Sequence, residues 1–374
     1  MLFETSLVEL EPVIPFAIAR GTKFQVTNVF LQLQIEGIRG IGEASPNAYY
    51  GENAQDVKLR LDRWLTAHTL PLPRSIEDIY QITESAAVDL APSRSAQCAL
   101  DLALWDIYAK SCNQSVCELV WGHKLKPVLS SITWGLTPFE NWEKQFALTS
   151  SSPILKIKCA GSGYTELWEW LSARYTGKIR LDANGAWSER QLIDFLESWL
   201  RSAQVGKGVV LDFLEQPLSP ALCQNLTAQS IHIIQNLKDQ IGTANKERSA
   251  QNRGGAFLIA DESLGPLKEI EKLLPFYDGI NIKLTKCGGI SPALLYLQKA
   301  KALGLKTMIG CMLESEVLIA AGMVVAQQAD YADLDGRWLL KSTPWEGWDF
   351  KNGSMYMEDG IGLQVRMGQK GAPS

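Results

Sequence analysis

The amino-acid sequence predicts an α/β fold in two parts, a barrel of parallel strands and a smaller α+β domain that precedes it. From residue 128 onward, strand-like apolar runs alternate with helical patterns, and several of these runs end on a charged residue. Residues 1–126 lack this alternation and carry an antiparallel hairpin pattern instead. At 374 residues, of which 46% are hydrophobic, the chain can build a substantial core in both parts.

The first domain, residues 1–126, is predicted to be a small sheet packed against helices. Residues 29–35 read VFLQLQI, in which apolar residues alternate with glutamines, and Gly37 and Gly40 punctuate the return of the chain. Three helices are expected next, near residues 54–67, 75–88 and 95–110. The boundary is placed near Pro127, and residues 341–374, which carry turn signals and short strands, are expected to return to this domain.

The barrel is predicted over residues 127–340. Eight strand-like runs occur there: VLSSITWG, ILKIKCA, IRLDANG, VVLDFLEQP, FLIADES, GINIKL, TMIGCML and YADLDG. The charged strand ends Lys158, Asp182, Glu215, Asp261 and Lys283 follow one another at steps of 24, 33, 46 and 22 residues. Apart from the third step, this is the spacing of a βα repeat. A doubly wound sheet is the alternative, but no dinucleotide glycine fingerprint follows the first strand.

Two local features of the barrel also carry predictions. The third step contains the polar stretch 243–255, which we expect to be a solvated, mobile insertion in the loop before the fifth strand. Between the runs LIA and GINI, the apolar residues at 267, 270, 273 and 274 predict a helix.

Composition excludes several classes of function. A net charge of -5 and a pI near 5.5 argue against nucleic acid or an anionic membrane as a partner. Acidic residues stand early in the chain and no apolar run approaches about 18 residues, which argues against a signal peptide or a membrane span. Seven cysteines without a C-x-x-C pair indicate reduced thiols in a cytoplasmic protein. Three separated histidines argue against a histidine-built metal site.

Three carboxylates, Asp182, Glu215 and Asp261, end three successive predicted strands. Because parallel strands end at the same face of a barrel, these charges would converge and repel one another unless a cation held them. Oxygen-only ligation points to Mg²⁺ rather than zinc. Asn184 and Glu262 follow closely and are expected to support the ligands. Taken singly, each acid could equally be a helix cap or a loop charge.

Lysines flank these acids. Lys156 and Lys158 are two residues apart and therefore share a face of one strand, while Lys283 comes from across the barrel. Two lysines on opposite sides of a metal-bound carboxylate could remove and return a proton at either face of a carbon, with Mg²⁺ stabilising the enediolate. The alternative is that the lysines only pair with the acids.

Five motifs carry a resemblance over nearly the whole chain: KIK at 156–158, LDAN at 181–184, EQP at 215–217, ADES at 260–263 and NIKLTKCGG at 281–289. In this order they resemble the enolase superfamily, in its muconate-lactonizing subgroup. The resemblance implies a capping domain on a (β/α)₇β barrel, with Mg²⁺ on Asp182, Glu215 and Asp261. It implies that Lys158 and Lys283 are the acid/base pair and that Lys156 steadies the substrate carboxylate. Lys286 is an extra lysine, expected to face outward or into a loop.

Two further motifs, IGCMLES at 309–315 and YADLDG at 331–336, resemble the dipeptide epimerases, which interconvert epimers such as L-Ala-D/L-Glu. The resemblance implies that Asp333 and Asp335 bind the substrate's α-ammonium group. Two carboxylates on one face of a strand end suit a cationic amine. By the same match, Thr133 and the backbone at Cys311 and Leu313 would contact substrate, and Arg20 would bind a substrate carboxylate.

The sequence therefore predicts an isomerase, a Mg²⁺-dependent epimerase of dipeptides. Within the same subgroup, o-succinylbenzoate synthesis, N-acylamino acid racemisation and lactone cycloisomerisation remain as alternatives, and their substrates lack a free amine. A barrel that binds a metal and ligand without catalysis is the alternative from a different class. The resemblance suggests a homo-oligomer.

Overall fold

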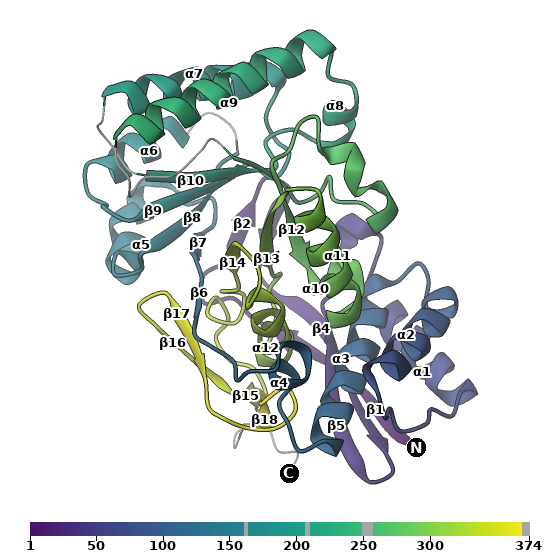
Figure 1. Cartoon of the computed structure of the whole chain (residues 1–374). Helices are drawn as coiled ribbons and strands as arrows, with labels where there is room; N and C mark the ends of the chain where they lie inside the picture. Colours follow the sequence, from purple (N-terminus) through teal and green to yellow (C-terminus); the bar gives the residue numbers. More distant parts are fainter. Residues whose placement is uncertain (161–163, 206–209, 249–256, 369–374) are drawn as a thin grey trace.

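The computed structural model describes residues 1–160, 164–205, 210–248 and 257–368. An eight-stranded parallel sheet forms the barrel, and the N-terminal domain packs against one side of it (Figure 1). No helix within these ranges has the length and apolar character needed to cross a membrane.

The N-terminal domain is built on a three-stranded sheet in the order β1-β4-β5. Its strands are β1 (Leu2–Leu10), β4 (Val26–Ile35) and β5 (Ile38–Ala44), and a separate hairpin joins β2 (Phe16–Ile18) to β3 (Gly21–Lys23). The predicted hairpin at residue 29 onward is confirmed, because β4 and β5 pair antiparallel. The pattern reading missed β1, which pairs with β4 along its whole length.

Helices cover this sheet. They are η1 (Ala48–Tyr50), α1 (Ala54–Ala67), α2 (Ile76–Asp89), α3 (Arg94–Ser111) and α4 (Val116–Trp121). The three predicted helices are confirmed as α1, α2 and α3, whereas η1 and α4 were not predicted. Helix α3 is buried over most of its surface and packs closely on β5, because Gly40 and Gly42 leave no side chain between the two elements. A Cβ at Gly42 would stand 1.8 Å from the Ala99 carbonyl oxygen. Glycine is therefore required at this crossing.

The barrel sheet runs in the unbroken order β14-β13-β12-β11-β10-β9-β8-β7. Its strands are β7 (Ile132–Trp134), β8 (Ile154–Lys158), β9 (Lys178–Asp182), β10 (Val210–Glu215), β11 (Leu258–Ala260), β12 (Gly279–Lys283), β13 (Lys306–Gly310) and β14 (Tyr331–Asp333). A parallel bridge between Ser130, just before β7, and Ala332 of β14 links the two ends of this sheet. This closure excludes the doubly wound alternative, so the predicted α/β barrel with a capping domain is confirmed.

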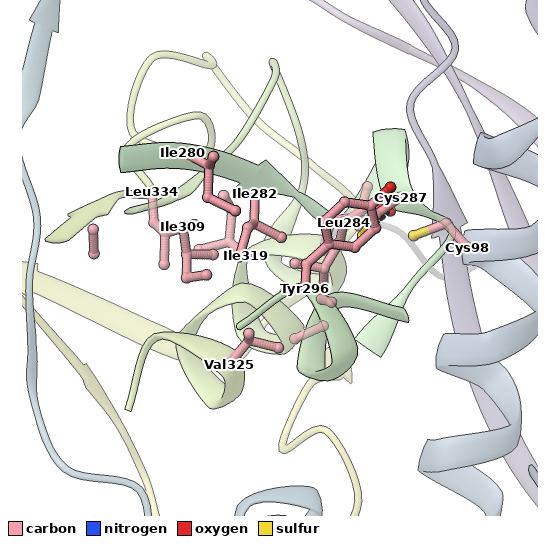
Figure 2. Packing of buried hydrophobic residues seen from close by; sticks show 14 of the residues in the cluster. Cys98, Ile280, Ile282, Leu284, Cys287, Tyr296, Ile309, Ile319, Val325 and Leu334 are labelled. Atoms are coloured by element: carbon pink, nitrogen blue, oxygen red, sulfur yellow. Dashed lines mark hydrogen bonds between the residues drawn. The ribbon is translucent and has the colours of Figure 1, made fainter. Parts of the chain in front are cut away.

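Helices surround the barrel on its outer face. They are η2 (Phe139–Asn141), α5 (Trp142–Thr149), α6 (Tyr164–Ser172), α7 (Glu189–Val205), α8 (Pro220–Gln224), α9 (Ala228–Arg248), η3 (Leu267–Leu273), α10 (Leu284–Cys287), α11 (Ile290–Ala302) and α12 (Glu316–Ala326). Strand alternation divides β12 between two environments: Ile280 and Ile282 pack outward near Ile319 of α12 (Figure 2), while Asn281 and Lys283 contact acids inside the barrel. The same strand therefore builds the core and the interior site.

Two predictions about the barrel need correction. Helix α9 continues to Arg248, so the first half of the stretch 243–255 is helical rather than a solvated loop. Good helix formers such as Lys246, Glu247 and Arg248 extend α9 beyond its apolar part. Residues 249–255 lie outside the described residues.

The segment between β11 and β12 is a 3₁₀-helix, η3, rather than the α-helix that its apolar spacing suggested. Pro266 precedes it and Pro275 closely follows it, which limits the segment to two short turns. Ile270 and Leu273 are still buried, so the apolar pattern identified the buried face correctly.

The C-terminal segment contains β15 (Trp345–Glu346), β16 (Trp348–Lys351), β17 (Ser354–Met357) and β18 (Arg366–Met367), and β17 pairs with β6 (Val128–Leu129). Two of its contacts reach the N-terminal domain: Trp345 stacks on Phe30 at 6.2 Å between ring centroids, and the Leu363 amide donates to Asp106 at 2.8 Å. The C-terminal segment therefore contacts the N-terminal domain as well as β6, and the division into residues 1–126 with 341–374 and residues 127–340 stays a prediction.

Two buried carboxylates of the N-terminal domain bind the first turns of barrel helices. Glu43 of β5 accepts hydrogen bonds from the Ser315 amide, the Ser315 hydroxyl and the Leu318 amide, at the start of α12. Asp101 of α3 accepts one from the Ser291 amide at 3.1 Å, at the start of α11. Because free amide groups and the helix dipole both favour an acceptor there, these contacts fix the domain against the mouth of the barrel.

Candidate active site

The residues predicted for the site meet at the C-terminal ends of the barrel strands. In the parallel ladders, Lys158 of β8 pairs with Asp182 of β9, and Asp182 pairs with Glu215 of β10. Asp261 follows β11 directly and Lys283 ends β12. Strand register therefore places Lys158, Asp182 and Glu215 side by side, and the common direction of the parallel strands brings Asp261 and Lys283 to the same end of the barrel.

Lys156 lies at the centre of the acids. Its side chain is only 2% exposed, and Nζ lies 2.8 Å from Glu215 Oε2, 3.2 Å from Asp182 Oδ2 and 2.6 Å from Asp333 Oδ2. Burial alone would lower its pKa, but the three carboxylates together hold the pKa well above its ordinary value. Lys156 is therefore a fixed positive charge in this structure.

The acids differ in their electrostatics. Burial alone would raise the pKa of Asp182, but Lys158 at 2.6 Å and Lys156 hold it below its usual range. Glu215 is buried beside Asp182, and these two effects raise its pKa to about 7, against the opposing influence of Lys156. Of the three acids, Glu215 is therefore the one that is hardest to ionise unless a cation lies beside it.

Lys286 corrects a prediction, because it faces the site instead of the solvent. Its Nζ donates to Asp261 Oδ1 at 2.7 Å and to the Asp261 carbonyl oxygen at 2.6 Å, while Lys283 Nζ donates to Asp261 Oδ2 at 2.9 Å. The one-turn helix α10 directs Lys286 back over the strand ends. Against the effect of burial, Lys283 and Lys286 hold the pKa of Asp261 well below its usual range.

The donor set fits a hard divalent cation. Asp182, Glu215 and Asp261 offer only carboxylate oxygens, each is at most 2% exposed, and Glu215 Oε2 accepts no hydrogen bond although Lys156 Nζ lies close to it. Within the described ranges, no three His, Cys, Asp or Glu side chains are gathered into a ready-made cage, and lysine ammonium groups contact all three acids. A cation would take up charge that the lysines now balance.

Asp333 and Asp335 lie at the end of β14, but each already has partners. Asp333 accepts from Lys156 and from the Ser131 hydroxyl at 2.7 Å, and Asp335 accepts from the Thr133 amide at 2.5 Å. Burial and the neighbouring Asp333 raise the pKa of Asp335 to about 7. Both carboxylates line the same cavity as Lys158 and Lys283.

Arg20, Thr133, Asn184, Cys311 and Leu313 also line this cavity, whereas Glu262 does not. Arg20 donates to Glu262 at 2.7 Å and to the Asn184 carbonyl at 3.1 Å, and its guanidinium lies over the Tyr49 ring. It therefore links the N-terminal domain to the loops after β9 and β11. The Leu313 carbonyl accepts a hydrogen bond from Asn28.

Sequence reasoning missed several side chains of the site. Asn281 donates to Glu215 at 2.8 Å and Ser131 to Asp333; each stands two residues before a predicted site residue, so strand alternation could have identified both. Lys23 and Tyr50 reach the cavity from the N-terminal domain. Burial, Lys283 and Arg20 lower the pKa of Lys23. No barrel periodicity points to these two residues.

Comparison with family models decides the family. Residues 3–121 match the N-terminal domain model of mandelate racemase / muconate lactonizing enzyme, and residues 156–370 match the enolase C-terminal domain-like model. The chain belongs to the mandelate racemase / muconate lactonizing enzyme family. The resemblance inferred from the five strand-end motifs is thereby confirmed.

Curated relatives in this family cover nearly all of the chain. The chain is 32% identical to a hydrophobic dipeptide epimerase from Roseobacter litoralis, over 94% of this chain and 95% of the relative. It is 29% identical to an L-Ala-D/L-Glu epimerase from Bacteroides thetaiotaomicron, over 94% of this chain and 84% of the relative.

Solved structures of the family are also similar. An enolase family member from Agrobacterium tumefaciens with homology to dipeptide epimerases, solved with sodium and L-Ala-L-Glu, is 26% identical at a TM-score of 0.75, covering 95% of this chain and 97% of that one. The dipeptide epimerase from Methylococcus capsulatus, complexed with Mg and L-Arg-D-Lys, is 25% identical at a TM-score of 0.78, covering 97% and 98%.

Proposed function

We propose that this protein is a Mg²⁺-dependent dipeptide epimerase, an isomerase that inverts one α-carbon by removing and returning its proton. One observation carries the proposal: Lys158 and Lys283 end β8 and β12, on opposite sides of the strands that carry Asp182, Glu215 and Asp261, and both lysines line one cavity with Asp261. Relatives named dipeptide epimerases over nearly the full length of the chain support it.

Asp182, Glu215 and Asp261 are the residues that would hold the metal. When bound, Mg²⁺ supplies positive charge that stabilises the substrate carboxylate as negative charge develops on it. Lys156, fixed at 2% exposure among the acids, adds a permanent positive charge at the same place. Asn281 orients Glu215 through its hydrogen bond to Oε1.

Lys158 and Lys283 perform the proton transfers. One lysine, in its neutral form, takes the α-proton from one face, and the other, as an ammonium group, returns a proton to the opposite face. Burial would lower the pKa of Lys283, but its pairing with Asp261 raises it above the ordinary value. Lys283 therefore becomes a base only when the charge of Asp261 is engaged elsewhere.

The carboxylates at the end of β14 are assigned to the substrate's free amine. Asp333 and Asp335 stand two residues apart and line the cavity beside Thr133. An ammonium group could replace or share the contact that Lys156 now makes with Asp333. This assignment favours a dipeptide over an N-acylated amino acid or a succinylbenzoate precursor.

Turnover of a dipeptide library tests the proposed function. Purified protein with Mg²⁺ is incubated in D₂O with dipeptides that include L-Ala-L-Glu, and proton NMR follows the α-protons. We expect deuterium at the α-position of the C-terminal residue and the appearance of its epimer. Turnover of only N-acyl amino acids or succinylbenzoate precursors would move the protein to another reaction of the family.

Two accompanying predictions concern the state of the protein. We propose that it is a homo-oligomer, which light scattering of the purified protein would test against the 41.4 kDa chain mass. We propose a cytoplasmic location, because seven cysteines are all unbonded in the structure. Cell fractionation would test the location.

A further inference from the structure

A second, larger cavity adjoins the site and is not used by the mechanism above. It has a volume of about 620 Å³ and shares Phe16, Thr133 and Leu339 with the cavity that holds the lysines and carboxylates. Pockets for small molecules commonly measure roughly 300–1,000 Å³. The two cavities are therefore neighbouring parts of one space.

The walls of this cavity are mainly apolar. They come from the segment around β2, from the chain after β7 with helix α5, and from the residues after β14; β2 lies beside β7 (Figure 1), where the Leu136 amide donates to the Ala17 carbonyl at 2.8 Å. The apolar side chains that face it include Ile14, Phe16, Leu136, Leu148, Trp338 and Leu339. Of these, Leu148 is 58% exposed and Ile14 is 49% exposed, so a bound apolar group could bury surface that is now exposed to solvent.

The cavity lies next to the residues that are assigned to the substrate's N-terminal amine. Thr133 lines both cavities, and its amide donates to Asp335, one of the two carboxylates assigned to the free amine. Lys158 and Lys283, which act on the C-terminal α-carbon, line only the first cavity. The apolar space therefore borders the N-terminal residue of a bound dipeptide.

We infer that the apolar cavity is the subsite for the side chain of the dipeptide's N-terminal residue, and that this residue is a large hydrophobic one. The inference rests on the proposed function. The ammonium group and the side chain of an amino acid share one α-carbon, so an ammonium at Asp333 and Asp335 leaves its side chain beside Thr133 and the cavity. An alanine methyl group would leave nearly all of the space empty, whereas a leucine or phenylalanine side chain would cover the apolar walls.

Matched dipeptides test this subsite. We would measure kcat/KM for epimerisation in two series, ending in L-Glu and in L-Leu, with Gly, L-Ala, L-Leu and L-Phe as the first residue. We expect kcat/KM to rise about tenfold or more from L-Ala to L-Leu or L-Phe within a series, as hydrophobic pockets discriminate by such factors. Equal or higher kcat/KM for L-Ala would overturn the inference while leaving the epimerase function intact.

A variant locates the preference in the cavity. Ile14→Gln/Leu148→Gln places amides on two exposed apolar walls, and we expect it to reduce the ratio of kcat/KM for L-Leu over L-Ala first residues. Leu59→Gln is the matched control, since Leu59 is 44% exposed on α1, outside the lining of both cavities. If the double variant keeps the wild-type ratio of kcat/KM for L-Leu over L-Ala first residues, the inference is contradicted. If that ratio is kept and an oligomer dissociates as well, these walls form a subunit interface instead of a subsite.

Two outcomes separate the inference from the function on which it rests. If no dipeptide in either series is epimerised, the proposed function fails. Calorimetric binding of the same dipeptides then tests whether the apolar cavity still binds the side chain of the first residue. Tighter binding of the L-Leu and L-Phe series would support the apolar subsite in a protein of another activity. Equal binding, or none, would overturn it.

Discussion

Asp261 shows how closely charge is balanced at the scale of single residues. Its two carboxylate oxygens contact two different lysines, Lys283 and Lys286, and all three side chains are buried. Isolated buried charges are costly, so such groups persist only where each has a partner. The protein therefore holds Lys283, one of its two candidate bases, as an ammonium group until a cation or a substrate changes the pairing.

Strand alternation predicted most of these residues, because side chains two apart share a face. It placed Lys156 beside Lys158, while the common end of parallel strands placed the acids together, and the structure confirms both. It failed for Lys286, whose direction depends on the turn after β12. There, Thr285 donates to the Ser45 carbonyl of the N-terminal domain, and Gly289 has φ +121° with Asp101 against it. Contacts between domains set that turn, and no local pattern encodes them.

Asp333 gives a prediction at this scale. Asp333→Asn removes the negative charge offered to an ammonium group, so we expect kcat/KM for dipeptides to fall by about tenfold or more, since hydrogen bonds to charged groups contribute roughly 1.5–3 kcal/mol. Steady-state kinetics with a dipeptide and with its N-acetylated form measures the effect. A loss of equal size for both substrates would mean that Asp333 acts only by holding Lys156.

At the scale of elements, the helix starts at the mouth of the barrel depend on acids from the other domain. Glu43 binds the first turn of α12 and Asp101 that of α11, so α11 and α12 each begin against a carboxylate that is far away in the sequence. The helices themselves were predictable from composition. Their partners, Glu43 and Asp101, were not predictable. No local sequence pattern indicates which distant helix a buried acid of the N-terminal domain will contact.

Asp101 gives a pH-dependent prediction for this interface. Burial raises its pKa from 3.8 to about 7, and one of its oxygens has no hydrogen-bond partner. The folded protein therefore binds a proton that the unfolded chain releases near pH 4, and the contribution of Asp101 to stability falls as pH rises from about 4 to about 7. The loss amounts to at most about 4 kcal/mol.

Thermal unfolding of wild type and Asp101→Asn across this pH range measures the contribution. We expect the difference in unfolding temperature between the two proteins to shift in favour of the variant as pH rises, because the amide stays neutral. Glu9→Gln, at an exposed position of β1, serves as the control. A pH-independent difference between Asp101→Asn and wild type would contradict the assignment.

At the scale of the whole molecule, the barrel brings together residues from six strands and closes the site with the N-terminal domain. The eight strand runs and their order were predictable, since each run is short, apolar and bounded by helical patterns. The sequence largely failed to predict that Arg20, Lys23 and Tyr50 reach over the open end of the barrel. Their position depends on how β2, β3 and η1 lie over the barrel, and the aligned motifs of the barrel say little about those segments.

Metal binding should therefore stabilise the molecule as a whole. Mg²⁺ at about 100 times its dissociation constant should raise the free energy of unfolding by about 2.7 kcal/mol, provided it binds only the folded chain. Thermal unfolding with Mg²⁺ and with EDTA measures the shift. Asp182→Asn should lose most of it, whereas Asp330→Asn, which affects an acid paired with Lys306 outside the site, should keep it. The same shift in both variants would place the metal elsewhere.

The most direct test of two-base epimerisation is α-proton exchange in D₂O by Lys158→Ala and Lys283→Ala, with each epimer of one accepted dipeptide and Mg²⁺ present. Each variant keeps a single lysine on one face of the α-carbon. We therefore predict that neither variant epimerises the dipeptide, and that each exchanges the α-proton of only one epimer, a different one for each variant. Epimerisation by either variant, or exchange of the same epimer by both, would contradict the assignment of Lys158 and Lys283 to opposite faces.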